Sequence, residues 1–158
     1  MSKISILMGS ESDLETVNEA VNVLNAFKVN FEAKVLSAHR TPKEVVKYVE
    51  SAAKKGTKVF IAAAGMSAAL AGVVAAHTTL PVIGIPIETK NLKGIDSLLS
   101  TVQMPPGIPV ACMAIGKAGA KNAALFALEI LGISDVKIKA KLINHKKQMR
   151  LKILNTKI

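Results

Sequence analysis

Apolar residues in the first part of the chain alternate between short continuous runs and longer stretches with helical spacing. Residues 3–8 form a continuous, mostly apolar run of the kind found in buried strands. After a polar loop, apolar side chains recur at the spacing of one helix face, at Leu14, Val17, Val21, Leu24 and Phe27. Residues 30–36 have the character of a second strand, and a second polar loop follows at 37–40. The pattern predicts a strand, a loop and a helix, and then the start of the same unit again.

The second helix carries signals at both of its ends. Thr41 stands as the N-cap with Glu44 three residues later, which predicts a capping box. Pro42 suits the first helical position, because the missing N–H needs no partner there. Gly56 is expected to end the helix. Its buried stripe is expected at Val45, Val46, Val49, Ala52 and Ala53.

The rest of the chain continues the alternation. We expect further strands at 58–63, 81–86 and 108–114, and further helices at 67–76 and 118–131. Residues 87–107 are predicted to be irregular, since they contain two glycines and two prolines. Helices between successive strands make right-handed crossovers, which place a parallel sheet between two helical layers. The sequence therefore predicts an α/β fold with three-layer α/β/α, flavodoxin-like architecture and a five-stranded parallel sheet.

The segment after Gly132 fits two interpretations. An edge strand is suggested by alternation with Lys at Val136, Ile138, Ala140 and Leu142. A single helical face also contains Ile138, Leu142, Met149 and Ile153. Strands seldom run as long as this pattern does, so we predict a C-terminal helix. We accordingly divide the chain into a catalytic domain at 1–134 and a basic helix at 135–158, packed on the same domain or on a neighbouring subunit.

The net charge is concentrated at the end of the chain. The 158 residues contain 21 Lys and Arg and 11 Asp and Glu, for a net charge of +10. Residues 135–158 carry eight of the basic residues and one Asp, so the body is nearly balanced. With no Trp, one Tyr and four Phe, there is little aromatic surface on which bases could stack. We therefore interpret the basic run as a solvated helix face and expect no nucleic-acid binding.

Other classes of protein are also disfavoured. No apolar run approaches the ~18 residues of a membrane span, so we expect no membrane insertion. Cys112 is the only cysteine and cannot form an intramolecular disulfide, and the N-terminal residues lack the pattern of a signal peptide. We expect a cytoplasmic protein.

Three loops are expected to meet at the carboxyl end of the sheet, where open parallel sheets bind ligands. They are residues 9–13, 37–40 and 63–67. In the first loop, Ser10 and Ser12 offer hydroxyls beside the amides of a helix N-terminus, an arrangement that binds phosphate. Asp13 would repel phosphate but accept a hydrogen bond from a sugar hydroxyl. A capping box of Ser12 and Glu15 is the structural alternative for this loop.

His39 is the strongest candidate for proton transfer. It stands next to Arg40, whose guanidinium can bind an anion with two N–H groups. The alternative is a loop histidine that bonds only to backbone, but its place after a strand and before a capped helix favours function. We assign structural roles to His77, which ends a predicted helix, and to Cys112, expected as buried filler in a strand. No spacing typical of a metal site occurs, and we expect no metal.

Several motifs together resemble one enzyme family, the 5-(carboxyamino)imidazole ribonucleotide mutases. They are the segments 8–13 (MGSESD), 37–42 (SAHRTP), 96–100 (DSLLS), 102–105 (VQMP) and 114–120 (AIGKAGA). The resemblance covers roughly residues 3–132. It implies a step of purine biosynthesis that moves a carboxylate from the exocyclic nitrogen to C4 of an aminoimidazole ribonucleotide, without ATP, metal or organic cofactor. It also implies a flavodoxin-like subunit and a homo-octamer.

The resemblance also assigns roles to individual residues. Its catalytic histidine corresponds to His39. Its phosphate and ribose contacts correspond to Ser10, Asp13 and Arg40, and its pocket is further lined at Ser12, Ser37, Ala64 and Gly65. Related carboxylases that use free carbon dioxide usually carry Lys-Gly in place of Arg40-Thr41, which favours the mutase. Many relatives have a second histidine at the position of Ala69, so this chain lacks that histidine and any role it has in those relatives.

Three alternatives remain at this level. The chain could be a direct aminoimidazole ribonucleotide carboxylase that uses carbon dioxide. It could be a carrier of flavin mononucleotide on the same fold, although aromatic residues that could stack on a flavin are scarce. It could also be a non-enzymatic RNA-binding or assembly module that works through its basic tail.

Overall fold

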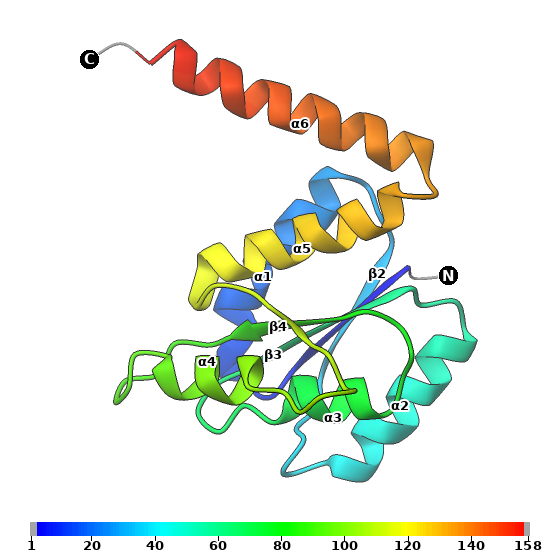
Figure 1. Cartoon of the computed structure of the whole chain (residues 1–158), viewed down its shortest axis with the longest axis vertical. Coiled ribbons are helices and arrows are strands. Elements are labelled where there is room, and N and C mark those ends of the chain that lie inside the picture. Colours follow the sequence, from blue (N-terminus) through cyan, green and yellow to red (C-terminus); the bar gives the residue numbers. More distant parts are fainter. Residues whose placement is uncertain (1–2, 157–158) are drawn as a thin grey trace. The chain divides into compact units, whose positions relative to one another are not determined.

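The computed structural model describes residues 3–156, and within them a five-stranded sheet forms the centre of the fold (Figure 1). Its strands are β1 (Ile4–Met8), β2 (Phe31–Val35), β3 (Val59–Ala64), β4 (Val82–Pro86) and β5 (Ala111–Cys112). They lie in the order β2-β1-β3-β4-β5, and every neighbouring pair is parallel. The predicted five-stranded parallel sheet is confirmed. The strand order reverses direction between β1 and β3, so a cleft is expected where these two strands end.

Helices cover both faces of the sheet. The described residues form the helices η1 (Glu11–Asp13, a 3-10 helix), α1 (Leu14–Ala26), α2 (Pro42–Lys54), α3 (Leu70–Ala76), α4 (Ile95–Val102), α5 (Gly116–Gly132) and, outside the sheet-bearing unit, α6 (Val136–Leu154). Figure 1 shows α1 on one face and α2 and α3 on the other. On the α2 and α3 face, Val49 and Val74 pack in one core with Phe60 of β3. The predicted α/β/α layering and flavodoxin-like architecture are confirmed.

The fifth strand is shorter than predicted. It covers two residues instead of 108–114. Pro109 has no N–H to give to a strand ladder, so regular pairing begins only after it. The ladder continues briefly past the strand, where the Met113 N–H donates to the Gly84 carbonyl at 2.9 Å.

The small-residue helix begins later than predicted, at Leu70 instead of Ser67. Met66 adopts a left-handed conformation with φ of 58°, and the Ala69 N–H turns back to the Ser67 carbonyl at 2.8 Å. These residues form a tight turn that the apolar composition did not reveal. Two of the small side chains of α3, Ala71 and Ala75, pack in the core against β3 and α2.

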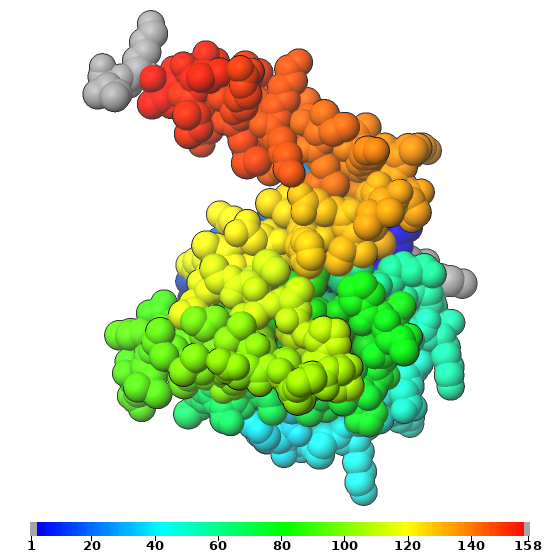
Figure 2. All heavy atoms as spheres, in the orientation of Figure 1, coloured from blue at the N-terminus to red at the C-terminus, as the bar shows by residue number. Residues whose placement is uncertain are grey.

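The segment expected to be irregular contains helix α4. This helix buries polar side chains and exposes apolar ones. Ser97 and Thr101 are buried, whereas Ile95, Leu99 and Val102 are 51%, 52% and 47% exposed. We call these three exposed residues the α4 apolar stripe. The segment that contains α4, coloured green, lies at the surface in the space-filling view (Figure 2). The buried hydroxyls bond to backbone, Thr101 to the Ser97 carbonyl at 2.7 Å. Apolar residues at helical spacing were a signal for this helix that the glycines and prolines around it obscured.

The predicted capping box at Thr41 does not form. The Thr41 hydroxyl accepts a hydrogen bond from the Ser37 N–H at 2.9 Å and donates to the Ser37 carbonyl at 3.1 Å. It therefore closes the preceding loop and does not cap α2. The end of the helix is as predicted, because Gly56 has a φ of 102°, a conformation that glycine adopts without strain.

The described chain divides into two compact units, one up to Ala127 and one from Leu128 onward. The second unit contains the end of α5 and the helix α6, which confirms the predicted C-terminal helix. The Asp135 carboxylate caps α6 by accepting from the N–H groups of Lys137 and Ile138, at 3.1 and 3.2 Å. Where residues 135–158 dock stays a prediction. None of the helices described here has the length and apolar character that crossing a membrane requires.

Candidate active site

A cavity of about 640 Å³ opens beyond the carboxyl ends of β1 and β3. All eight residues predicted for the site line it: Ser10, Ser12, Asp13, Ser37, His39, Arg40, Ala64 and Gly65. The three loops therefore meet as expected. The roles of these side chains toward a substrate remain predictions, and the geometry below indicates what each can do.

The first loop is held by a capping box that differs from the expected one. The Ser10 hydroxyl accepts from the Ser12 N–H at 3.3 Å, and the Asp13 carboxylate accepts from the Ser10 N–H at 3.0 Å. The Ser12 hydroxyl donates to that of Ser10 at 3.0 Å. The box is therefore one of Ser10 and Asp13 around η1, and Glu15 instead forms an ion pair with Lys117. This box leaves two serine hydroxyls in the cavity.

Asp13 is the most buried ionisable group of the cavity, at 6% exposure. Burial raises the pKa of its carboxyl above the usual value, although hydrogen bonds from the backbone of Ser10 and the side chain of Ser12 act in the opposite direction. A carboxylate in this state is costly to keep ionised and gains from further donors. Asp13 is therefore suited to accept hydrogen bonds from ligand hydroxyls.

Arg40 ties the second loop to the first. One Nη2 N–H donates to the Gly9 carbonyl at 2.7 Å, and Nε donates to the Ser37 hydroxyl at 3.3 Å. The Arg40 backbone N–H bonds to the same hydroxyl at 3.2 Å. These contacts use one edge of the guanidinium, and within residues 3–156 Nη1 has no hydrogen bond. That group can bind an anion without releasing the loop.

His39 is exposed beside Arg40 at the cavity. In the described part of the chain its imidazole has no hydrogen-bonding partner, so the alternative of a histidine bonded to backbone is not what the structure shows. Its two ring nitrogens remain available to donate or accept a proton.

A fourth segment, residues 87–89, completes the cavity and was not predicted from the sequence. The Ile87 N–H donates to the Ala64 carbonyl at 2.9 Å, which places the segment beside the third loop. The rule that ligands bind beyond strand ends could have found it, because β4 ends at Pro86. Ala69, which stands where many relatives carry a histidine, also lines the cavity.

Other candidates lie outside the cavity. His77 follows the last residue of α3 and lines a separate cavity. Cys112 lies on β5 and is partly exposed, not buried filler as predicted, although partial burial raises the pKa of its thiol. Among the described residues, no three His, Cys, Asp or Glu side chains gather as a metal site would require.

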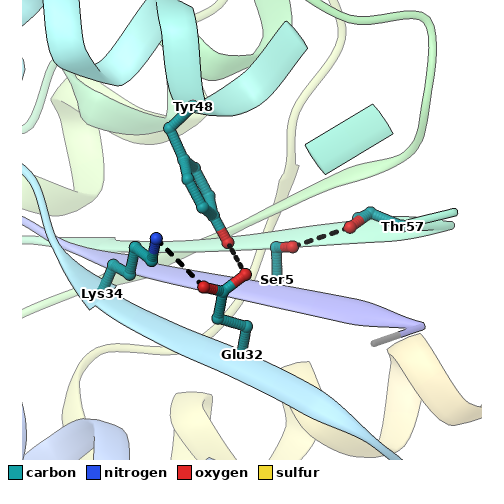
Figure 3. Close-up of polar contacts among 5 residues, drawn as sticks. All are labelled: Ser5, Glu32, Lys34, Tyr48 and Thr57. Atoms are coloured by element: carbon teal, nitrogen blue, oxygen red, sulfur yellow. Dashed lines mark hydrogen bonds and ion pairs between the residues drawn. The ribbon is translucent and has the colours of Figure 1, made fainter. Parts of the chain in front are cut away.

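A second cavity, of about 730 Å³, lies between β2 and α2, and we call it the β2–α2 groove. The Glu32 carboxylate accepts from the Tyr48 hydroxyl and from Lys34 Nζ, each at 3.0 Å (Figure 3). Lys34 Nζ also lies 4.6 Å from the centre of the Tyr48 ring. Ser5 and Thr57 form a buried hydroxyl pair at 2.9 Å. No predicted site residue lines this groove.

Comparison with known proteins identifies the family of the chain. Residues 3–152 match the model of the family described as AIR carboxylase. The chain belongs to the AIR carboxylase family. The match includes every residue that lines the cavity and most of the C-terminal helix α6.

Curated members of the AIR carboxylase family resemble the chain along nearly its whole length. A protein of Saccharolobus solfataricus named N5-carboxyaminoimidazole ribonucleotide mutase is 51% identical over 158 residues, which is 100% of this chain and 99% of that protein. A protein of the same name from Pyrococcus abyssi is 55% identical over 150 residues, covering 95% of this chain and 85% of its own length. A crystal structure of Treponema denticola PurE has a TM-score of 0.87 at 30% identity and covers 96% of this chain and 93% of that one.

Proposed function

We propose that this chain is an N5-carboxyaminoimidazole ribonucleotide mutase of purine biosynthesis. It moves a carboxylate from the exocyclic N5 to C4 of the imidazole, with no ATP, metal or organic cofactor. The observation that carries the proposal is that His39 lines the same cavity as Arg40 and the serine hydroxyls of the first loop. The names of relatives about half identical over nearly the full length support it.

The substrate is held by its phosphate and ribose. The phosphate binds to the hydroxyls of Ser10 and Ser12 and to Arg40 Nη1, since charge-assisted hydrogen bonds are the strong ones. Asp13 accepts from a ribose hydroxyl. Ser37 holds Arg40 in place, and Ala64 and Gly65 form the wall of the pocket.

His39 acts first as an acid and then as a base. Its imidazolium gives a proton to N5 as the carbon–nitrogen bond breaks, the bonding electrons return to nitrogen, and carbon dioxide is released. The ring carbon C4 then uses its electron pair to attack carbon dioxide. Neutral His39 removes the C4 proton, which restores the aromatic ring and the imidazolium. Protons and electrons balance within one histidine and one substrate.

Carbon dioxide must remain near C4 between the two steps. It is neutral and offers little to hold, so exclusion of water and restricted volume matter more than specific bonds. Apolar wall residues of the cavity, among them Ala69, Leu70 and Ile87, serve this purpose. With Ala69 in place of a histidine, steering of carbon dioxide depends on this wall and not on a second imidazole.

The deciding experiment is an assay with N5-carboxyaminoimidazole ribonucleotide. The expected result is formation of the C4-carboxylated product without ATP or bicarbonate. If product formed only from aminoimidazole ribonucleotide and added bicarbonate, the direct carboxylase would replace this proposal. The residues Arg40-Thr41, which stand where the related carboxylases usually carry Lys-Gly, favour the mutase. The flavin carrier has less support, since among the described residues that line the cavity there is no Phe, Tyr or Trp.

We further propose that the enzyme works in the cytoplasm as a homo-octamer without nucleic-acid partners, with residues 135–158 packed on its own domain or on a neighbouring subunit. The α4 apolar stripe supports assembly, because three adjacent exposed aliphatic residues on one helix gain from being covered. Leu99→Lys should lower the mass measured by light scattering without unfolding the subunit. A wild-type mass of one chain in a fully active sample would exclude the octamer.

A further inference from the structure

One wall of the cavity is built from residues that the proposed mechanism does not use. Thr89 lies in this wall, in the segment that follows β4. Its Cγ2 is 3.2 Å from the position that a Cβ on Gly65 would occupy, so the two residues are in close contact. Thr89 is therefore a polar side chain directly beside a predicted substrate-binding residue.

The first turn of α4 fixes this wall. The buried Ser97 hydroxyl donates to the Ile87 carbonyl at 2.7 Å. The Thr89 hydroxyl is 3.2 Å from each oxygen of the Asp96 carboxylate. The Lys93 N–H bonds to the Thr89 carbonyl at 3.0 Å. Hydrogen bonds to residues in and just before the first turn of α4 therefore hold both the backbone and a side chain of the segment.

The contact with Asp96 determines what the Thr89 hydroxyl can offer to a ligand. An ionised carboxylate only accepts hydrogen bonds, so the single hydroxyl proton of Thr89 is directed at Asp96. The remaining lone pairs of the Thr89 oxygen can only accept. A neighbouring negative charge also makes this oxygen a better acceptor and an unfavourable neighbour for anions.

We propose that Thr89 binds the substrate by accepting a hydrogen bond from its nucleoside part, and that Asp96 is a positioning residue that keeps the hydroxyl an acceptor. The donors available are the N–H of the aminoimidazole and the O–H groups of the ribose. The phosphate and the migrating carboxylate are kept away from this wall, which orients the substrate toward Arg40. The inference rests on the proposed function for the identity of the substrate.

Steady-state kinetics of matched variants test the role of the hydroxyl. Thr89→Val keeps the shape and removes the hydroxyl, and it should lower kcat/KM about tenfold, mainly through KM. Thr89→Ser keeps the hydroxyl and should stay within about threefold of wild type. Ser100→Ala is the control, because it removes a hydroxyl from the same helix that bonds only to the Asp96 carbonyl. Equal losses in Thr89→Val and Thr89→Ser would assign the effect to packing and overturn the proposal, as would no loss in Thr89→Val.

A double-mutant cycle tests the role of Asp96. Asp96→Asn presents an amide that can donate to Thr89 and turn its hydroxyl proton toward the cavity, so kcat/KM should again fall about tenfold. In the Thr89→Val background the same change should have little further effect, because Asp96 acts through Thr89. Full additivity of the two losses would contradict a positioning role.

Calorimetry separates the two donors and also separates this inference from the proposed function. Aminoimidazole ribonucleotide and an analogue without the amino group are titrated into wild type and Thr89→Val. A penalty for Val with the first ligand alone identifies the amine, a penalty with both identifies the ribose, and no penalty with either overturns the inference. Because binding is measured without turnover, an inactive wild type that still shows the penalty would refute only the proposed reaction.

Discussion

Two of the cavities in the first unit, the site cavity and the β2–α2 groove, have similar volumes but differ in how their polar groups are bonded. In the β2–α2 groove, the Glu32 carboxylate accepts from both Lys34 and Tyr48 (Figure 3). In the site cavity, His39 and Arg40 Nη1 have no hydrogen bond from the described residues and face a pocket of about 640 Å³. Volume alone therefore does not identify a site. Hydrogen-bonding capacity that the fold does not consume is the better indicator.

The two cavities also differ in what their polar groups contribute to the stability of the fold. The groove ties the edge strand β2 to α2 with groups that satisfy each other, so its polar residues serve stability. In the site cavity, burial raises the pKa of Asp13, which means that the fold holds a charge at some cost. Local costs of this kind are expected where a site is kept ready for a ligand. Removing polar groups should therefore affect turnover at the site and stability at the groove.

The largest effect is expected at His39. His39→Asn should reduce turnover at least a hundredfold, since the only proposed acid and base is lost, while ribonucleotide binding stays within about tenfold, or ~1.4 kcal/mol. Turnover and calorimetric binding measure the two effects separately. A variant that retained more than a few per cent of the wild-type rate would remove His39 from the mechanism.

Arg40→Ala and Ser10→Ala should raise KM by about tenfold or more, because each removes a charge-assisted contact of ~1.5–3 kcal/mol with the phosphate. Initial-rate kinetics over a range of substrate concentrations give the result. A loss confined to kcat would contradict the placement of the phosphate. Lys47→Ala in the groove is the matched control for loss of a cation and should leave KM unchanged.

Thr57→Val should lower stability by about 1 kcal/mol and leave kcat/KM unchanged. The change leaves the buried Ser5 hydroxyl without its partner at 2.9 Å, and an unsatisfied buried hydroxyl costs ~1–3 kcal/mol. Chemical denaturation measures it, with Thr57→Ser as the control that keeps the hydroxyl. A loss of activity without loss of stability would contradict the assigned division between the two cavities.

Tyr48→Phe should cost about 0.5 kcal/mol of stability, since its partner Glu32 is partly solvated and can rebond to water. Turnover should not change. Denaturation midpoints of the wild type and the variant, measured side by side at neutral pH, provide the comparison. A reduced kcat in a fully folded Tyr48→Phe enzyme would mean that the groove contributes to function.

The smallest effect is a dependence of stability on alkaline pH. Burial, together with the neighbouring Glu32, raises the pKa of Tyr48 to about 12. An unfolded tyrosine ionises near pH ~10, so the contribution of Tyr48 is intact below that pH and is lost as pH rises toward 12. Thermal unfolding should therefore show a greater fall in Tm between pH 9 and 11 for wild type than for Tyr48→Phe. Equal falls would show that Tyr48 does not contribute.

Much of the fold could be predicted because hydrophobic periodicity is a local signal. The run at 3–8 and the spacing of Leu14, Val17 and Val21 gave β1 and α1, and the same reasoning gave α2 and α6. Helix α4 was not predicted, because the glycines and prolines around it obscured the helical spacing of its exposed apolar residues. Its buried face is polar, and Gly84 of β4 leaves room there for Thr101, whose Cγ2 would clash with a Cβ at position 84.

The candidate site was predictable in its members but not in its contacts. Loop positions at strand ends predicted that Ser10, Asp13 and His39 lie together, and the adjacency of β1, β2 and β3 in the sheet brings their loops to one edge. The segment 87–89 was missed, because its apolar and polar residues carry no motif. Its position follows from hydrogen bonds to Ser97 and Asp96 in a helix that was itself not predicted.

The amino-acid sequence by itself determined the five strands, the helices other than α4, and the residue types available at the strand ends. Tertiary structure alone decided how those residues are used. Thr41 bonds to Ser37 instead of capping α2, and Arg40 reaches the Gly9 carbonyl across 31 positions of the chain. The physical reason is the distance along the chain over which each signal acts. Hydrophobic periodicity is a pattern among residues a few positions apart, whereas the partner of a polar side chain is fixed only when the folded backbone brings distant loops together.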